Sequence, residues 1–472
     1  MRALFDRLGR AAGEVAVIGL GASGRAAAQL LRRGGVAVYA SDAGHADRVR
    51  ETAALLRDVG ADVDTGTHDL ARIARAAIVV ASPGVPPTAP ALATAAAAGV
   101  PVIGELEVAL TAMPALRYVA ITGTNGKTTT TALVGQLLRA LGHDAVDAGN
   151  IGTPLAEYAL RPVPPTWAAL ETSSFQLHDL PGIAPTVGVV TNLSPDHLDR
   201  YDSLEAYYGD KARLFRNATD DSRWVLNADQ PDVLDLWRLM PADVTPRPTR
   251  LAGHVACVSL VREADAWYDS GTATLVLHGE PLLARHELAL VGDHNVANAL
   301  TAALAVWEAD VAHRTPAARA TMAAALRTFH ALQHRLEPVP TTDGVLWLND
   351  SKATNVSSTL VAVQGMTRPF VLLLGGRHKG EPYTALAEPF RAHGVAVVAY
   401  GEAAAQVEHD LGPLVRVERE DGGFASVVAR ARRLVPAGGA VLLSPACSSY
   451  DMFRNYEERG AAFRRLARGE TA

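Results

Sequence analysis

The 472-residue chain has little of several features that would send a protein out of the cytoplasm. It has only two cysteines, Cys257 and Cys447, which are too few for a disulfide framework and agree with a reducing compartment. No run of about 18 apolar residues occurs, so we expect no membrane-spanning helix. The N-terminal segment has no apolar stretch that ends in small residues, so we expect no secretion signal. Together these absences predict a cytoplasmic protein.

The chain also lacks an excess of positive charge, because its net charge is −6. This balance argues against general binding to nucleic acid, which requires a basic surface. Any anionic ligand must therefore be bound by local groups of basic residues and by backbone N–H groups. We expect a monomer that binds small molecules and neither nucleic acid nor a membrane.

The length predicts more than one domain, because a single core stops growing at roughly 250–300 residues. Short β-branched runs alternate with Ala/Leu/Arg-rich stretches, a pattern typical of parallel sheets covered by helices. The predicted strands are Val15–Gly19, Ile78–Ser82, Tyr118–Thr122, Val187–Asn192, Phe370–Gly375 and Ala440–Ser444. The predicted helices include Arg25–Arg33, Pro90–Gly99 and Thr129–Leu141.

Glycine-rich turns divide this pattern into three units. Two strand-to-helix turns with glycines lie about a hundred residues apart, and a strand followed by Gly-Gly occurs at Leu374–Gly380. We predict three α/β domains over residues 1–105, 106–331 and 332–472, with breaks near Glu105 and Ala331. The first and third would be Rossmann-like, and the central one a P-loop ATPase-like parallel sheet.

The second glycine-rich turn has the features of a phosphate loop. The sequence Gly123-Thr-Asn-Gly126-Lys127-Thr128 lies between a predicted strand and a predicted helix. Backbone N–H groups of such a loop point at an anion, and the helix N-terminus adds partial positive charge. Lys127 would then reach the β- and γ-phosphates, and the Thr128 hydroxyl would bind Mg²⁺. Because the two glycines are closer together than in the usual motif, a tight turn with a solvated lysine remains an alternative.

This shortened loop resembles the ATP loop of the Mur ligase superfamily, which also contains the folylpolyglutamate synthetases. The resemblance covers nearly the whole chain, with its segments in the family's order. It implies an ATP-dependent ligase that joins a carboxylate to an amine through an acyl phosphate. The ATP-binding residues that it implies are Gly123, Thr124, Asn125, Gly126, Lys127, Thr128, Thr129, Asn295, Asn298, Arg335 and Asp350.

Acidic and imidazole groups follow the strands of the central domain, where ligands collect in open α/β sheets. From the residues alone, His197 could make an ordinary polar contact and Lys211 could be a surface lysine. The resemblance implies instead that Thr128, Glu171 and His197 bind Mg²⁺, and that Lys211 is carbamylated and carries a negative charge. That modification needs a neutral amine, which a desolvated or cationic pocket favours. With Lys127, His197 and Lys211, Asn150 completes the implied catalytic set.

The third domain contains the most discriminating segment, Asn349-Asp-Ser-Lys352-Ala-Thr354-Asn355. Its form resembles the branch of the family that adds D-glutamate to UDP-N-acetylmuramoyl-L-alanine. The D-glutamate-binding residues that this implies are Lys352, Thr354, Lys379, Ser449 and Tyr456, although the family usually has Phe in place of Tyr456. The alternative is that the two lysines bind ATP phosphates or lie in solvent. We expect Cys447 to be structural.

The first domain opens with Gly19-Leu-Gly21-Ala-Ser-Gly24, with Asp42 about 20 residues further on. This imitates a dinucleotide fingerprint in which the third glycine comes one residue early. An NAD(P)-dependent oxidoreductase is therefore a rival, but no catalytic group for hydride transfer accompanies the motif. The resemblance implies binding of the UDP group by Gly21, Ala22, Ser23, Asp42, Ser82, Gly84 and Asn150. A different Mur ligase, a folylpolyglutamate synthetase and a nucleotide sensor without turnover are further rival functions.

Overall fold

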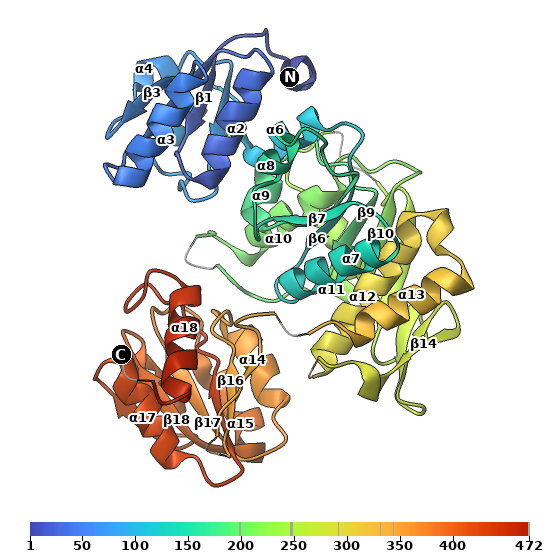
Figure 1. Ribbon diagram of the computed structural model, residues 1–472, viewed down its shortest axis with the longest axis vertical. Coiled ribbons are helices and arrows are strands. Elements are labelled where there is room, and N and C mark those ends of the chain that lie inside the picture. The colour runs from blue at the N-terminus through green and yellow to red at the C-terminus, as the bar shows by residue number, and fades with distance from the viewer. Residues whose placement is uncertain (198–199, 246–248, 291, 331, 343, 471–472) are drawn as a thin grey trace.

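The computed structural model describes residues 1–197, 200–245, 249–290, 292–330, 332–342 and 344–470. Its strands form three separate sheets that follow one another along the chain. Figure 1 shows the corresponding three lobes, coloured blue, green to yellow, and orange to red. In the described part of the chain, no helix is both long enough and apolar enough to cross a membrane.

The first sheet has five parallel strands in the order β3-β2-β1-β4-β5. Its strands β1 and β4 are buried throughout, because helices cover both faces of the sheet. The strands are β1 (Val15–Ile18), β2 (Val38–Asp42), β3 (Asp62–Thr65), β4 (Ile78–Ala81) and β5 (Val102–Gly104). The helices are α1 (Arg2–Arg7), α2 (Ala22–Arg33), α3 (Asp47–Asp58), α4 (Leu70–Ile73) and α5 (Pro90–Ala97).

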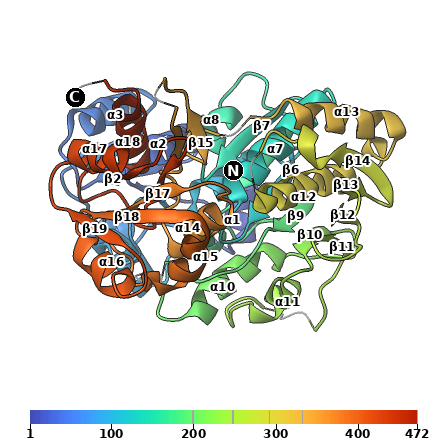
Figure 2. The same ribbon diagram turned by 90° about the horizontal axis from the view of Figure 1, so that it is seen from below.

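The central sheet has nine strands in the order β14-β13-β12-β11-β10-β9-β6-β8-β7, in which β13 pairs antiparallel with β12 and with β14 and the other pairs are parallel. The strands are β6 (Arg117–Thr122), β7 (Ala145–Gly149), β8 (Trp167–Glu171), β9 (Val187–Val190), β10 (Arg223–Asn227), β11 (His254–Ser259), β12 (Ala266–Asp269), β13 (Thr274–Leu277) and β14 (Glu280–Ala284). The helices are α6 (Glu105–Ala112), α7 (Lys127–Ala140), α8 (Leu155–Ala159), α9 (Ser174–His178), α10 (Leu204–Ala212), α11 (Pro231–Leu234), α12 (Asp293–Ala309) and α13 (Pro316–Arg327). Helices α7, α12 and α13 cover one face, and α10 and α11 lie on the other (Figure 2).

The third sheet has six strands in the order β15-β16-β20-β17-β18-β19, with β15 antiparallel to β16 and the other pairs parallel. The strands are β15 (Glu337–Val339), β16 (Leu346–Asn349), β17 (Phe370–Gly375), β18 (Gly394–Tyr400), β19 (Val417–Glu420) and β20 (Ala440–Leu443). The helices are α14 (Val356–Gln364), α15 (Ala387–His393), α16 (Ala404–Leu411), α17 (Phe424–Leu434) and α18 (Tyr456–Ala467), with a short 3-10 helix, η5 (Tyr383–Leu386), before α15.

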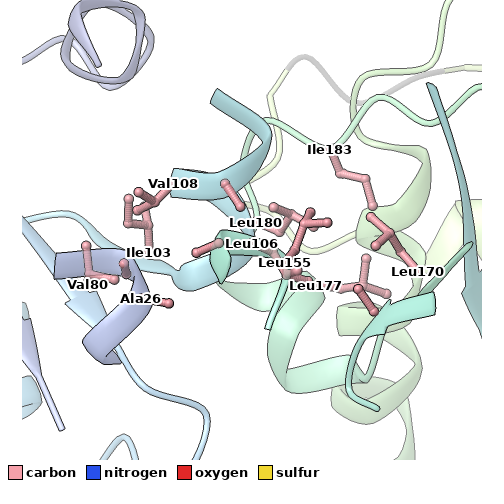
Figure 3. Close-up of a cluster of buried hydrophobic side chains, with 14 of the residues drawn as sticks. Ala26, Val80, Ile103, Leu106, Val108, Leu155, Leu170, Leu177, Leu180 and Ile183 are labelled. Carbon is pink, nitrogen blue, oxygen red and sulfur yellow. The ribbon is translucent and has the colours of Figure 1, made fainter. Parts of the chain in front are cut away.

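The first and central domains share one hydrophobic core, whereas the cores of the third domain contain residues of that domain alone. Figure 3 shows the shared region, in which Ala26, Val80 and Ile103 of the first domain lie on one side of Leu106. Leu155, Leu177 and Leu180 of the central domain continue the cluster on the other side. Apolar packing therefore fixes the first domain to the central one.

The α/β fold class and its three parallel-rich sheets confirm the prediction, and each of the six predicted strands corresponds to a strand of the structure. The strand predicted at Val187–Asn192 ends at Val190, because the next residues turn toward the glycine loop, where the Thr124 N–H donates to the Asn192 carbonyl. The predicted break near Glu105 falls where β5 meets α6. The break near Ala331 lies outside the described residues, and the domain boundaries stay predictions.

Candidate active site

The glycine loop connects β6 to α7 at the carboxyl edge of the central sheet. Gly126 has φ +79°, and a Cβ atom there would lie 2.4 Å from the Asn298 Oδ1 atom of α12. Gly123 has φ +135°, and its Cβ atom would lie 2.1 Å from Thr191 Oγ1. Both positions therefore require glycine, because a side chain would be strained and would collide with the wall of the site. The loop lies between a strand and a helix, as expected.

Lys127 folds back over this loop. Its ammonium group donates to the carbonyl oxygens of Gly123, at 3.0 Å, and Thr124, at 2.7 Å. Burial lowers the pKa of Lys127, and the neighbouring carboxylates of Glu171 and Asp196 oppose that shift. Backbone carbonyl groups of the loop therefore hold the ammonium against the loop itself.

Thr128 begins a hydrogen-bond chain through Glu171. The Thr128 hydroxyl donates to Glu171 Oε2 at 2.6 Å, and the Asn150 amide donates to Oε1 at 3.0 Å. Although burial opposes ionisation, the ammonium groups of Lys127 and Lys352 hold the pKa of Glu171 below its ordinary value. Glu171 is thus a buried anion with oxygen atoms suited to a hard cation.

His197 lies beyond the end of β9 with a left-handed backbone, φ +56°. Its Nε2 atom is 3.6 Å from Asp196, and its ring packs edge-on against Phe175. Burial lowers the pKa of His197 to about 4, so the neutral imidazole keeps a lone pair at physiological pH. Among the residues that the structure describes, no three His, Cys, Asp or Glu side chains come together as a metal-binding group.

Lys211 is buried, with 1% of its surface exposed, so the interpretation of a surface lysine is wrong. Its ammonium donates to the Gly123 carbonyl at 2.8 Å and lies 4.4 Å from the centre of the Tyr207 ring. Burial, reinforced by the charge of Lys127, lowers the pKa of Lys211 well below its ordinary value. Burial at this position therefore favours the neutral amine, the form of lysine that carbamylation needs.

A cavity of about 450 Å³ lies between the glycine loop, α12 and the start of the third domain. Seven of the predicted ATP-binding residues line it: Asn125, Gly126, Thr129, Asn295, Asn298, Arg335 and Asp350. Arg335 donates to the Thr128 hydroxyl at 2.6 Å, so the third domain reaches the base of the loop. Gly123, Thr124, Lys127 and Thr128 are not among the lining residues.

The five residues predicted to bind D-glutamate fall into separate groups. The Lys379 ammonium lies 3.4 Å from the Thr354 hydroxyl and 3.8 Å from Asp196. Lys352 instead donates to the Thr128 hydroxyl at 3.2 Å, and its ammonium lies 5.2 Å from the centre of the Tyr456 ring. Ser449 is buried on the loop after β20. Lys352 thus faces the glycine loop, as the alternative assignment to ATP phosphates requires.

In the first domain, the predicted UDP-binding residues gather at the carboxyl ends of β1, β2 and β4. Asp42 accepts hydrogen bonds from the backbone N–H groups of Leu20, at 2.8 Å, and Gly44, at 2.7 Å. Ser82 donates to the Gly19 carbonyl at 2.9 Å, and Gly21 precedes the first turn of α2. Ala22 and Ser23 begin α2, whereas Gly84 follows β4.

A second cavity, of about 350 Å³, extends from this edge to the central domain. Its lining includes Ser82 from the first domain and Phe175, Gln176 and Tyr201 from the central domain. It could therefore receive a ligand that contacts both domains.

Family models agree with this organisation. The Mur ligase middle domain matches residues 121–306, and the Mur ligase MurD-like N-terminal domain matches residues 13–104. A relative from Salinibacter ruber called UDP-N-acetylmuramoylalanine--D-glutamate ligase is 40% identical over 459 residues, which are 95% of this chain and 96% of the relative. A protein of the same name from Anaeromyxobacter dehalogenans is 42% identical over 461 residues, which cover 96% and 97% of the two chains. The chain belongs to the Mur ligase family.

Solved Mur ligases share the fold of this chain. The UDP-N-acetylmuramate-alanine ligase of Thermotoga maritima has a TM-score of 0.57 at 18% identity, over 95% of this chain and 98% of that one. The MurF ligase of Thermotoga maritima, in complex with ADP, has a TM-score of 0.59 at 15% identity, over 91% and 95% of the two chains. The family assignment leaves the oxidoreductase interpretation without support.

Several polar residues of this Mur ligase line the larger cavity although the sequence motifs did not single them out, among them Asp229, Gln230, His294, Ser357 and Ser358. His294 directly precedes Asn295, one of the residues that the family resemblance implies for ATP binding, and that position was its signal. Ser357 and Ser358 bond the Asn125 side chain at 2.9 and 2.6 Å. Ser357 and Ser358 follow the Asp-Ser-Lys segment by a few residues. They belong to the site because the third domain docks against the central one.

Proposed function

We propose that this Mur ligase uses ATP to add D-glutamate to UDP-N-acetylmuramoyl-L-alanine, a step in the synthesis of peptidoglycan precursors. The observation that carries the proposal is the similarity of almost the whole chain to relatives that bear the name of this activity. The glycine loop with Thr128 and Glu171 at its base supports the use of ATP. The use of ATP and the two free cysteines support a cytoplasmic site of action. The monomeric state stays a prediction.

Thr128, Glu171 and His197 would hold Mg²⁺. The anionic Glu171 beside a hydroxyl, and a His197 imidazole kept neutral by its low pKa, are chemically suited to a cation. When bound, Mg²⁺ neutralises charge that develops during phosphoryl transfer. The two cationic side chains now on the Thr128 hydroxyl, Arg335 and Lys352, would turn toward the phosphates.

The reaction has two displacement steps. A carboxylate oxygen of the UDP-sugar forms a bond to the γ-phosphorus of ATP, and ADP leaves with the electrons of the broken P–O bond. The D-glutamate amine then attacks the carbonyl carbon of the acyl phosphate, loses a proton and expels inorganic phosphate. Lys127 would exchange its two carbonyl partners for phosphate oxygens and stabilise charge in the first step. Asn150 and His197 would lie beside the reacting carboxylate.

Lys211 would act as a carbamate. Its neutral Nζ atom would form a C–N bond to CO₂ and release a proton, which converts a cationic side chain into an anionic one. The burial that lowers the pKa of Lys211 favours this reaction, because it disfavours the ammonium form. The resulting anion would balance the positive charge of Lys127 and assist cation binding.

The substrates would bind at two places, the carboxyl edge of the first sheet and the loops of the third domain. Asp42 and Ser82, with Gly21, Ala22, Ser23 and Gly84, would hold the UDP group, and the smaller cavity would lead from there to Phe175 and Gln176 of the central domain. Lys379, Thr354 and Ser449 would bind the carboxylates of D-glutamate, because a buried carboxylate needs cationic and hydroxyl partners. Lys352 and Tyr456 would lie between the amino acid and the ATP phosphates.

Phosphate release tests the proposal. With ATP, Mg²⁺ and UDP-N-acetylmuramoyl-L-alanine present, D-glutamate should support release, whereas L-glutamate, L-alanine and diaminopimelate should not. Release that depends on one of the other amino acids would assign the chain to a different Mur ligase activity. ATP binding without release under any of these conditions would favour a sensor.

A further inference from the structure

Two loops of the third domain carry groups proposed to bind D-glutamate, and backbone hydrogen bonds join the two loops near their base. Lys379 lies on the loop after β17, and Ser449 lies on the loop after β20. The Arg377 N–H donates to the Ser448 carbonyl at 2.9 Å, and the Ser448 N–H donates back at 3.2 Å. The Gly375 N–H, at the end of β17, also donates to the Pro445 carbonyl at 3.1 Å. These bonds lie at the base of the two loops, before Lys379 in one and before Ser449 in the other, so they do not by themselves fix Lys379 relative to Ser449.

Tyr383 of η5 provides a further connection between the two loops. Its hydroxyl lies 2.9 Å from Cys447 Sγ, on the loop of Ser449, and 2.8 Å from His378 Nδ1, on the loop of Lys379. The Tyr383 ring is buried, and its backbone N–H donates to Asp410 of α16 at 3.0 Å. The hydroxyl is therefore anchored by the body of the domain and bonded to both loops.

The hydrogen-bonding capacity of these groups matches this arrangement. Burial raises the pKa of Tyr383, and burial also raises the pKa of the Cys447 thiol to about 11, so both groups keep their protons at neutral pH. A phenol can donate one hydrogen bond and accept another, which is what a bridge between two partners requires. His378 is adjacent in sequence to Lys379, and Cys447 is two residues from Ser449, so each bond acts close to a substrate-binding group.

We propose that Tyr383 is a positioning residue for D-glutamate, because its hydroxyl, held between His378 and Cys447, fixes the relative placement of the loops that carry Lys379 and Ser449. This inference rests on the proposed function, since it assumes that the two loops bind the amino-acid substrate. Tyr383 itself acts through the loops and does not need to touch the substrate.

Steady-state kinetics of Tyr383→Phe, with each substrate varied in turn, test the role. Removal of the hydroxyl should raise the KM for D-glutamate about fivefold, the loss expected for one hydrogen bond of ordinary strength, while kcat and the KM for ATP change less than about twofold. Tyr400→Phe is the matched control, because Tyr400 on β18 is a buried tyrosine of the same domain whose hydroxyl is hydrogen-bonded to neither His378 nor Cys447. Its KM for D-glutamate should equal that of the wild type.

His378→Ala provides a second variant that should fold normally, because His378 is exposed. It should raise the same KM, and adding it to Tyr383→Phe should cost little more, since both changes break one chain of hydrogen bonds. An unchanged KM for D-glutamate in Tyr383→Phe would overturn the inference, as would an equal rise in the KM values of all three substrates. If the wild type itself releases no phosphate with D-glutamate, the proposed function fails, and that result is separate from any behaviour of the variants.

Discussion

Lys211 and Glu105 are ionisable side chains at positions from which the fold excludes water. Lys211 lies behind the glycine loop and has 1% of its surface exposed, and Glu105 at the start of α6 has 4%. In both cases burial shifts the pKa toward the neutral form, downward for the amine and upward for the acid. The consequences differ, because a neutral amine is a nucleophile, whereas a neutral acid avoids the cost of a buried charge.

The carbamate proposed for Lys211 predicts chemical rescue. Lys211→Ala should lower the rate of phosphate release by orders of magnitude, because the negative charge beside the glycine loop is lost. Millimolar acetate should restore part of the rate, since a small carboxylate replaces the charge without a covalent link. Lys127→Ala is the control, because it loses a positive charge that acetate cannot replace. A folded Lys211→Ala variant that does not respond to acetate would count against the carbamate.

The buried carboxyl group of Glu105 should make the stability of the fold depend on pH. Burial raises the pKa of Glu105 from 4.5 to about 7, so the folded protein retains this proton after the unfolded chain has released it. The free energy of unfolding therefore falls as the pH rises from about 4.5 to about 7, by at most about 3 kcal/mol, and Glu105→Gln removes this loss.

Urea unfolding of wild type and Glu105→Gln at pH 5 and pH 8 measures the effect. The variant should gain stability relative to the wild type at the higher pH, because its amide still accepts the Ala156 N–H bond but carries no charge. The exposed Glu388→Gln should show no such gain. Equal differences between Glu105→Gln and wild type at both pH values would contradict the argument.

Among the elements, helix α18 stabilises the loops that follow β16 and β20 in the third sheet. Its buried Arg459 donates to the Ser351 carbonyl at 2.7 Å, the Ser351 hydroxyl at 3.0 Å and the Cys447 carbonyl at 3.1 Å. One guanidinium thus connects the loop of Lys352 with the loop of Ser449. A planar group with five donors can do this, whereas a lysine cannot.

Arg459→Met should therefore lower the free energy of unfolding by about 2–4 kcal/mol, because it leaves buried carbonyl groups without partners. Arg454→Ala is the control near the start of the same helix, since the Arg454 side chain is 88% exposed and pairs at the surface with Glu458. Chemical unfolding that follows the third domain should separate the two variants. A stability of Arg459→Met equal to that of Arg454→Ala would show that the guanidinium is replaceable.

The sequence predicts some strands of this fold and not others. Strand β6 was predictable because it is a short apolar run buried nearly throughout, followed by glycine. Strand β15 has a proline at Pro338 and pairs only at the sheet edge, and β12 is mostly half-buried, so neither has the apolar pattern that marks a strand. In the site, the family resemblance implied that Thr128 and Glu171 bind the same cation, and their side chains share a hydrogen bond. Contacts such as Asn125 with Ser357 depend on how two domains dock, which a local pattern does not contain.

At the scale of the whole molecule, the domains are joined unequally. The first and central domains share a hydrophobic core that contains residues from Leu4 to Val244. The third domain has its own cores, and near the glycine loop hydrogen bonds and ion pairs connect it to the central domain, such as Asn355 to Asp196 and Lys379 to Asp196. When two domains separate, polar groups can exchange their partners for water, whereas apolar surface has no such replacement.

Two fragments should therefore behave differently. A fragment of residues 1–330 should fold and unfold as one cooperative unit, because both parts of the shared core are present. A fragment of residues 105–472 should aggregate or bind hydrophobic dyes, because the apolar faces of α6 and α8 have lost their partners on α2. Circular dichroism and size-exclusion chromatography distinguish these outcomes. A soluble, monomeric 105–472 fragment with native helix content would show that the shared core is dispensable.

The same shared core has a consequence for synthesis on the ribosome. A chain of this design cannot complete its first folding unit when residue 104 emerges, because the cluster that covers α2 includes side chains as far along as Val244. At about 5–20 residues per second, the first domain must wait on the order of ten seconds with part of its apolar surface uncovered. Nascent chains of this length are therefore where a chaperone that binds apolar surface should act, and its release should coincide with the arrival of the central sheet.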